Sequence, residues 1–283
     1  MDIVSRIKDR MLHLRPTEQK IARFVLADLS FAASASINEL AEKAGVSHAS
    51  ITRLAKTLDC KNVRELKMLL AQSAAVGERF ISSKPVKKKD IPAIYQGIHE
   101  ILDLNAGLLS NKLIRQASQV ITRAGHVLIF GVGGGSTMLA EESHYRLFRL
   151  EVKSNAYSDP MLMRMTAATV DKNDAVLCLS LSGVSPDVLA SAQIAKEYGA
   201  QVIAICPAGP LAEIADVHLP IATQETDYIF KPSASRYVML AAIDILVSDV
   251  AVCNQKKSRE KLRRLKHHLD QHRKGSERLP LGD

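Results

Sequence analysis

The sequence of 283 residues predicts an all-α domain at the N-terminus, followed by an α/β domain whose parallel sheet has about five strands and helices on both faces. Apolar residues in the first part recur at helical spacing. From residue 127 onward, short apolar runs alternate with helical patterns. Between the two parts, residues 82–92 contain two prolines and five charges, as an exposed linker does. We therefore expect one domain over residues 1–80, a linker over 81–92 and a second domain over 93–283.

Positive charge is concentrated at the two ends of the chain. Residues 1–90 contain 17 Lys/Arg and 10 Asp/Glu, residues 91–254 contain 11 and 16, and residues 255–283 contain 10 and 4, so the three parts carry +7, −5 and +6. A basic small domain joined to an acidic one favours nucleic acid as the partner of the basic part. Aromatic residues make up 4% of the chain and Trp is absent, which disfavours a surface that stacks bases.

Two helices joined by a short turn form the central motif of the N-terminal part, after an earlier helix with Thr17 as its expected N-cap. The first of the pair begins at Ser36, which forms a capping box with Glu39. It ends at Gly45, a residue type that favours the left-handed conformation at helix ends. The second begins at Ser47 and has an apolar stripe at helical spacing. A turn containing glycine between two amphipathic helices is the helix-turn-helix pattern.

The outer face of the second helix has the composition of a recognition helix. Short side chains near its N-terminus allow a helix to enter the major groove, while Arg53 and Lys56 can contact phosphates or guanine. The alternative is a solvated polar face on an ordinary helix pair, but the capping box, the glycine and the basic charge together favour DNA binding. The candidate DNA-binding residues are Ser47, His48, Ala49, Ser50, Thr52, Arg53 and Lys56.

The second part predicts helices and strands in alternation. Strands are expected at residues 127–130, 152–157, 175–181, 202–206 and 217–221. Helices are expected at 95–109 and 112–123 before the strands, at 138–150, 159–168, 186–198 and 211–215 between them, and at 233–253 and 256–273 after them. The most apolar long run is 238–252. Because two aspartates interrupt it and it is shorter than the ~20 residues of a membrane span, we expect a buried helix there.

Two turns that follow predicted strands have the composition of phosphate cradles. Residues 131–137 place four glycines before the start of a helix, where the backbone can approach a ligand and the free N–H groups favour an anion. Residues 180–185 place three serines around one glycine before another helix, more hydroxyls than a simple cap requires. The candidate phosphate-binding residues are Gly133, Gly135, Ser136, Thr137, Ser180, Ser182, Gly183 and Ser185.

A dinucleotide site is the alternative for the glycine turn. Its fingerprint is G-x-G-x-x-G, but Ser136 stands where the third glycine, counted from Gly131 and Gly133, should be. Asp159 could serve as the ribose-binding acid, but it lies 28 residues after Gly131 rather than about 20. The dinucleotide fold also does not involve a second, serine-rich cradle. The two turns together therefore favour one small phosphorylated ligand.

The remaining residues with reactive side chains form no catalytic pattern. The four cysteines are far apart without a C-x-x-C pair, so we expect reduced and mostly buried thiols in a cytoplasmic protein. His144 and His218 are isolated, and a lone histidine is more often structural than catalytic. The first 20 residues contain no apolar segment typical of a signal peptide. We expect no catalytic residue, no metal, no cofactor and no membrane partner.

The order of these motifs resembles the RpiR family of bacterial transcription regulators, which join an N-terminal helix-turn-helix to a sugar isomerase (SIS) domain. The resemblance covers nearly the whole chain: residues 46–53 resemble the recognition helix of the family, 131–136 its glycine turn, 180–185 its serine turn, and 225–236 the loop before the last long helix in regulators of the HexR type. The glycine turn is one residue longer than the usual form. The resemblance implies that Ser136, Ser180, Ser182 and Ser185 hold the phosphate of a sugar or sugar acid, which meets Glu225 at its other end.

The resemblance further implies a regulator of carbohydrate-metabolism genes, with three partners: a double-stranded DNA operator, a phosphorylated sugar effector, and further copies of the chain in a homodimer or tetramer. The alternative is a sugar-phosphate isomerase with an accessory basic domain, because isomerases of this fold use a carboxylate base near Glu225. No histidine pairs with Glu225 in the sequence, which disfavours catalysis. A nucleotide-dependent enzyme is the third alternative, and the broken glycine fingerprint makes it the weakest.

Overall fold

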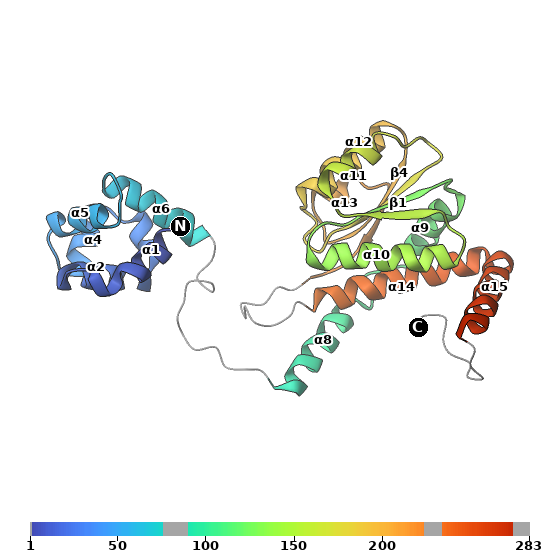
Figure 1. Cartoon of the computed structure of the whole chain (residues 1–283), viewed down its shortest axis with the longest axis horizontal. Helices are drawn as coiled ribbons and strands as arrows, with labels where there is room; N and C mark the ends of the chain where they lie inside the picture. The colour runs from blue at the N-terminus through green and yellow to red at the C-terminus, as the bar shows by residue number, and fades with distance from the viewer. Residues whose placement is uncertain (1, 76–89, 224–233, 274–283) are drawn as a thin grey trace. The chain divides into compact units, whose positions relative to one another are not determined.

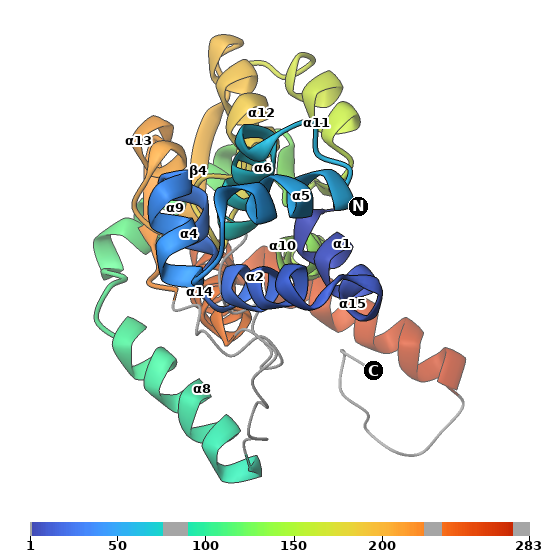
Figure 2. The same cartoon turned by 90° about the vertical axis from the view of Figure 1, so that its left-hand side faces the viewer.

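Residues 2–75, 90–223 and 234–273 are described by the computed structural model, and they belong to two compact units (Figure 1). The first unit is helical (Figure 2). Its helices enclose one apolar core. Its elements are α1 (Ile3–Arg10), the 3-10 helix η1 (Met11–His13), α2 (Pro16–Ala27), α3 (Leu29–Ser34), α4 (Ile37–Ala44), α5 (His48–Thr57) and α6 (Val63–Ala75). An all-α N-terminal domain, as predicted, is confirmed.

Helix caps explain where the two central helices of this unit begin and end. Ser36 caps α4 in the predicted box: its backbone N–H donates to the Glu39 carboxylate over 2.7 Å, and the Glu39 N–H donates to its hydroxyl over 3.2 Å. Gly45 follows with a φ of 61°, in the left-handed region. The prediction that Thr17 caps α2 is wrong. Arg15 is the N-cap and donates its N–H to Glu18 over 3.0 Å, because a proline directly after it favours an earlier helix start.

The second unit is built on a five-stranded parallel sheet in the order β2-β1-β3-β4-β5. The strands are β1 (Val127–Phe130), β2 (Ser154–Tyr157), β3 (Ala175–Leu179), β4 (Gln201–Cys206) and β5 (Val217–Pro220). The helices are α8 (Ile91–Asn105), α9 (Asn111–Arg123), α10 (Gly134–Arg149), α11 (Pro160–Ala167), α12 (Pro186–Glu197), α13 (Pro210–Ile214), α14 (Ser235–Cys253) and α15 (Gln255–Arg273). Every strand and helix predicted in this part is present, with small shifts at the ends.

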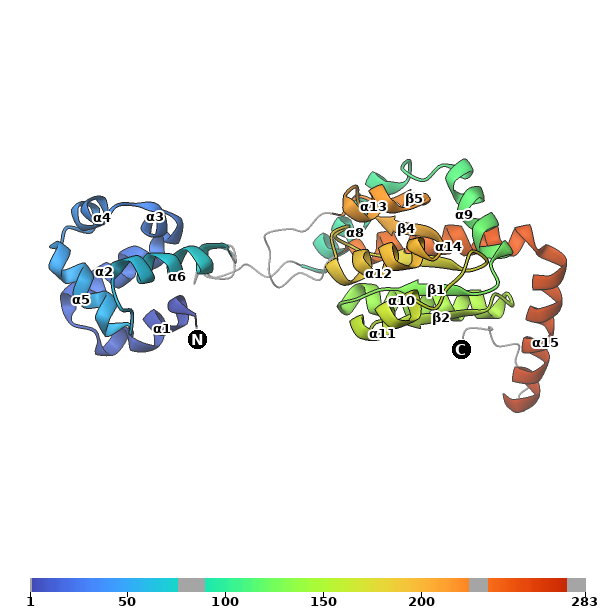
Figure 3. The ribbon, with the colours of Figure 1, turned by 90° about the horizontal axis from the view of Figure 1, so that it is seen from above.

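Apolar side chains on both faces of the sheet pack against helices. Along β1, Val127 and Ile129 belong to the core under α8, α9, α10 and α14, whereas Leu128 and Phe130 belong to the core under α11, α12 and α13. Successive strand residues point to opposite faces, so an unbroken apolar strand is buried on both. Figure 1 shows the two helix layers on either side of the strands, and Figure 3 looks along the direction in which the layers are stacked. The predicted parallel sheet with helices on both faces is confirmed.

Helix α14 is the buried helix predicted from the apolar run. Val238, Ala242 and Leu246 lie on its side toward the sheet core. None of the described helices is by itself long and apolar enough to cross a membrane, and one bent pair, α14 with α15 at 106°, passes on length and composition only.

Candidate functional site

The turn between β1 and α10 requires a glycine where the backbone returns on itself. A Cβ on Gly131 would lie 2.4 Å from the Ser136 carbonyl oxygen, closer than any side chain tolerates. The Thr137 hydroxyl donates to the Gly131 carbonyl over 3.2 Å, and the Thr137 N–H donates to the Gly133 carbonyl over 2.9 Å. Gly133 has a φ of 86°, a conformation that favours glycine. Thr137 therefore supports the turn from inside.

Helix α10 begins at Gly134 rather than at residue 138 as the sequence predicted, so part of the glycine run lies in its first turn. The apolar pattern starts only at Met138, because the two glycines before it have no side chain to mark the helix. The N-cap residue Gly133 has no side chain that could satisfy the first N–H groups of the helix. Those groups are available to an anion. Ser136 is buried within this first turn.

The turn after β3 is shaped by the hydroxyls of its serines. Ser180 is buried, and its Oγ accepts the Gly183 N–H over 3.0 Å and lies 3.4 Å from Oγ of Ser182. The exposed Ser182 also accepts the Val184 N–H over 3.3 Å. Gly183 has a φ of 72°, and a Cβ there would lie 2.9 Å from the Pro207 carbonyl oxygen. Ser180 thus fixes the turn, while Ser182 borders the solvent.

Ser185 is the N-cap residue of α12, but its side chain makes no capping hydrogen bond. Its hydroxyl and the first N–H groups of α12 are therefore not engaged with one another. Pro186 stands at the first helical position, where the lack of an N–H costs nothing.

The two turns meet at the point where the direction of strand order reverses. Strand β1 pairs with β2 on one side and with β3 on the other, and α10 and α12 leave β1 and β3 toward opposite faces of the sheet. Ligands of open parallel sheets bind outside the carboxyl ends of the strands at this position. A Cβ on Gly135 would lie 2.9 Å from Cδ1 of Leu181, so the glycine turn and the serine turn are in contact. We call these two turns, which the sequence predicts to bind a phosphate, the phosphate crevice.

The segment after β5 is attached to this crevice by a contact that sequence reasoning missed. The Thr223 hydroxyl donates to the Leu181 carbonyl over 3.1 Å, in the middle of the serine turn. Its neighbour Ala222 exchanges two hydrogen bonds with the side-chain amide of Asn105, at the end of α8. No local sequence pattern predicts either contact, because the partners are far apart in the sequence. Glu225, predicted to meet the sugar end of the ligand, lies outside the described residues.

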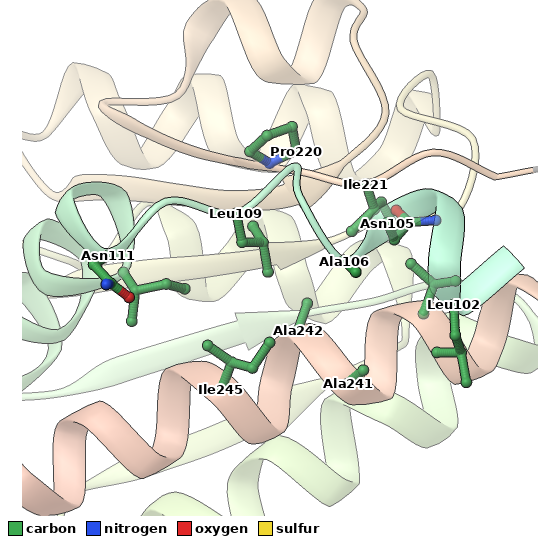
Figure 4. Close-up of a pocket in the computed structure, with 12 residues that line it drawn as sticks. Leu102, Asn105, Ala106, Leu109, Asn111, Pro220, Ile221, Ala241, Ala242 and Ile245 are labelled. Atoms are coloured by element: carbon green, nitrogen blue, oxygen red, sulfur yellow. The ribbon is translucent and has the colours of Figure 1, made fainter. Parts of the chain in front are cut away.

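A separate apolar cavity of about 200 Å³ lies between α8, the end of β5 and α14. Figure 4 shows Leu102 and Asn105 on one side of it, and Ala242 and Ile245 of α14 on the other. Ile221, next to the Asn105–Ala222 contact, also lines it. The cavity is thus lined by residues that flank the connection between α8 and the phosphate crevice.

The candidate recognition helix α5 is fixed on the helical core by its predicted apolar stripe, in which Ile51 and Leu54 are fully buried. On the outer side, His48, Ala49, Arg53 and Lys56 are exposed, and Thr52 is half-buried. Ser47 is exposed and caps the helix by accepting the Ser50 N–H.

Ser50 does not lie on that outer face, where the sequence placed it. Its side chain is buried and its Oγ lies 3.0 Å from Oγ of Ser47, so it belongs to the N-cap. Arg53 donates to the same Oγ of Ser50 over 3.2 Å. Ser50 lies one helical turn from the buried Leu54 and next to the buried Ile51, which explains why its side chain faces inward.

His144, His218 and two of the four cysteines occupy structural positions. His144 lies 3.1 Å from the Ser154 hydroxyl, and His218 lies 2.9 Å from the Cys206 carbonyl oxygen. Burial raises the pKa of the Cys206 thiol to about 12 and raises the pKa of Cys178 further, so both are unreactive thiols. Cys253 is the exposed member of the four. Among the described residues, no group of His, Cys, Asp and Glu has the arrangement of a metal site.

Comparison with known proteins identifies both units. Residues 1–77 match the model of the helix-turn-helix domain of the rpiR family, and residues 120–248 match the model of the SIS domain. The chain is 28% identical over 288 aligned positions to the HTH-type transcriptional regulator HexR of Escherichia coli K12, with 100% of this chain and 99% of that protein covered. It is 29% identical to HexR of Pseudomonas aeruginosa, with 95% of each chain covered. Its fold is similar to that of the Vibrio vulnificus NanR protein complexed with ManNAc-6P, at 20% identity and a TM-score of 0.57, with 93% of this chain and 96% of that one covered.

Proposed function

Because the chain belongs to the RpiR family, we propose that it is a transcriptional regulator of carbohydrate-metabolism genes. It combines the rpiR-type helix-turn-helix domain with a SIS domain, and in this proposal a phosphorylated sugar or sugar acid controls its DNA affinity. The observation that carries the proposal is the contact between the glycine turn and the serine turn at the reversal of strand order. One chain thereby combines a phosphate crevice with an exposed basic helix in a DNA-binding domain.

The effector binds in this proposal through its phosphate. The uncapped N–H groups of α10 and α12 supply backbone donors, and the hydroxyls of Ser136, Ser182 and Ser185 supply side-chain donors. The glycines Gly133 and Gly135 permit close approach of the backbone, and Glu225, which lies outside the described residues, is the proposed partner of the sugar part. Ser180, Gly183 and Thr137 keep the two turns in shape.

DNA binding in this proposal uses α5. Ser47, His48, Ala49 and Thr52 face base edges, while Arg53 and Lys56 contact phosphates or guanine. Two copies of the chain, in a homodimer or tetramer, read the two halves of a palindromic operator. The protein works in the cytoplasm, where its DNA and its effector are found, and it has regulation rather than catalysis as its role.

The test is an operator gel shift at a stated salt concentration, with fragments from around the protein's own gene. We expect one fragment to be retained, and a phosphorylated sugar to change its affinity by about 5–150-fold, equal to a coupling of about 1–3 kcal/mol. The ligand panel contains hexose phosphates, phosphorylated sugar acids and ManNAc-6P, and binding to the chain is measured separately by thermal shift. Turnover of a bound sugar phosphate, together with retention of no fragment, would support an isomerase instead and overturn the proposal.

A further inference from the structure

The last described helix, α15, is strongly basic. Its 19 residues contain eight Lys/Arg and two Asp/Glu. The preceding part of the chain, residues 91–254, carries a net charge of −5, so the basic character is specific to this helix and not general to the unit. Figure 3 shows α15 extending beyond the layers of the sheet.

One side of α15 is docked on the body of the unit. Ser258 is buried, and Leu262 packs against the core under α14. On the same side, Lys257 and Lys261 form ion pairs with Glu151 over 3.4 and 2.6 Å. These contacts fix the rotation of the helix about its axis.

The opposite side of α15 presents three basic residues in a row. Lys256, Arg259 and Arg263 follow one another at spacings of three and four residues, so they share one face of the helix. All three are exposed, and within the described part of the chain none of them takes part in an ion pair, although Glu260 lies beside them. Together with Gln255 and Glu260 they line an open hollow of about 370 Å³. We call these three residues the α15 basic stripe.

We propose that the α15 basic stripe binds the phosphate backbone of DNA, as a second and sequence-independent contact in addition to those of the recognition helix. The proposal rests on the function proposed above, because the helix-turn-helix domain brings the DNA to the molecule. The stripe extends over about 10 Å of helix axis, enough for three cations to meet neighbouring phosphates. Two of the three are arginines, whose planar guanidinium groups suit phosphate oxygens.

The composition of α15 favours DNA over a lipid surface. A helix that lies on a membrane presents large apolar residues, commonly aromatic, on the face opposite its basic residues. On α15 that face is formed by Ser258 and three leucines, it has no aromatic residue, and Leu262 is already engaged with the core. The part of this side that contains Ser258 and Leu262 is therefore used for docking on the protein.

The test measures operator affinity against salt concentration for the full chain and for the triple variant Lys256→Gln, Arg259→Gln, Arg263→Gln. Each phosphate contact contributes about 0.9 to the slope of log affinity against log salt. The variant is expected to lower the magnitude of the slope by about 2 to 3 for each copy of the chain on the operator, with the preference for operator over an unrelated fragment unchanged. A charge-preserving variant, Arg259→Lys with Arg263→Lys, is expected to retain the original slope.

The matched control is Lys112→Gln, Lys153→Gln, Lys172→Gln, which removes the same charge from exposed positions of the same unit. An unchanged slope in the stripe variant, or a reduction equal to that of the control, would overturn the proposal. The proposal would also be overturned if the stripe variant lost binding to phosphatidylserine vesicles but kept the salt slope of DNA binding. If the unmodified chain binds no DNA fragment at all, the proposed function itself fails, which is a different result. A urea unfolding curve confirms that the stripe variant is folded.

Discussion

Asn105 and Ala222, which lie 117 positions apart, are joined by a pair of hydrogen bonds: the Asn105 amide donates to the Ala222 carbonyl over 2.9 Å, and the Ala222 N–H donates to the Asn105 side-chain oxygen over 2.7 Å. Ala222 is followed by Thr223, whose hydroxyl donates to Leu181 in the serine turn. Helix α8, the first helix described after the linker, is thereby connected to the phosphate crevice through two residues. A ligand that moves the serine turn has a short physical route to α8.

Asn105→Ala is expected to lower the free energy of unfolding by about 1–3 kcal/mol, because both backbone groups of Ala222 lose their partner in a partly buried place. The variant is also expected to reduce the effect of the ligand on operator affinity, while affinity without ligand stays the same. Urea unfolding and the gel shift measure the two effects. Asn111→Ala is the matched control, since Asn111 lines the same cavity without a described side-chain hydrogen bond. Equal ligand response in the two variants would show that the Asn105 contact does not transmit the signal.

Gly131→Ala is expected to destabilise the second unit by about 1–3 kcal/mol and to abolish effector binding, because the added methyl would overlap the Ser136 carbonyl. Gly134→Ala adds the same methyl where no atom lies within 4 Å, inside the first turn of α10. The free energy of unfolding of the Gly134→Ala control is expected to stay the same or to rise by up to about 1 kcal/mol, since alanine is the better helix former. Thermal unfolding and thermal shift with sugar phosphates distinguish the variants. Equal loss in both would mean that the tight turn at Gly131 is not the cause.

Ser180 and Ser182, two of the three serines of the second turn, are expected to respond differently to replacement by alanine. Ser180→Ala removes the acceptor of the Gly183 N–H in a buried place and is expected to cost about 1–3 kcal/mol of stability. Ser182→Ala removes an exposed hydroxyl and is expected to weaken effector binding with a much smaller change in stability. Calorimetric titration and urea unfolding give the two quantities. Undiminished effector affinity in Ser182→Ala would remove this hydroxyl from the binding site.

Arg53→Gln is expected to weaken operator binding by about 1–3 kcal/mol if the guanidinium contacts guanine, with relaxed preference at one base pair. A phosphate contact would instead weaken all sequences alike and reduce the salt slope by about 1. Arg64→Gln removes the same charge from an exposed position on α6 of the same unit and serves as the control. Competition gel shifts with single-base operator variants measure both quantities. No difference between the two arginine variants would exclude Arg53 from the interface.

The docking of α15 is expected to depend on pH through Glu151. Hydrogen bonds from Lys261, followed by those from Lys257, hold the pKa of this carboxyl below its ordinary value of 4.5. A depressed folded-state pKa contributes stability above the ordinary pKa, and the contribution is lost as the pH falls through the folded value. Glu151→Gln should therefore narrow the difference in stability between pH 7 and pH 3, as measured by urea unfolding. An identical pH profile in the wild-type chain and the variant would contradict this role.

Much of the fold could be predicted because the signals are local. The Ser36–Glu39 box, the left-handed Gly45 and the Ser47 cap each depend on atoms within a few residues, so they can be predicted without knowledge of tertiary contacts. The same is true of the apolar strands, which are buried on both faces as their composition requires. Two helices begin earlier than predicted: the proline after Arg15 is a local signal that favours the earlier start of α2, whereas the glycines that begin α10 have no side chain to mark the helix.

The sequence by itself determined the two domains, their secondary structure and the two turns suited to phosphate. Only the tertiary structure decided that those turns touch through Gly135 and Leu181 and that Asn105 binds Ala222. The physical reason is the range of the interactions. Caps and turns are stabilised by neighbours along the chain, whereas contacts between distant segments depend on the order in which the strands pair, and the apolar pattern of a strand does not specify its partner.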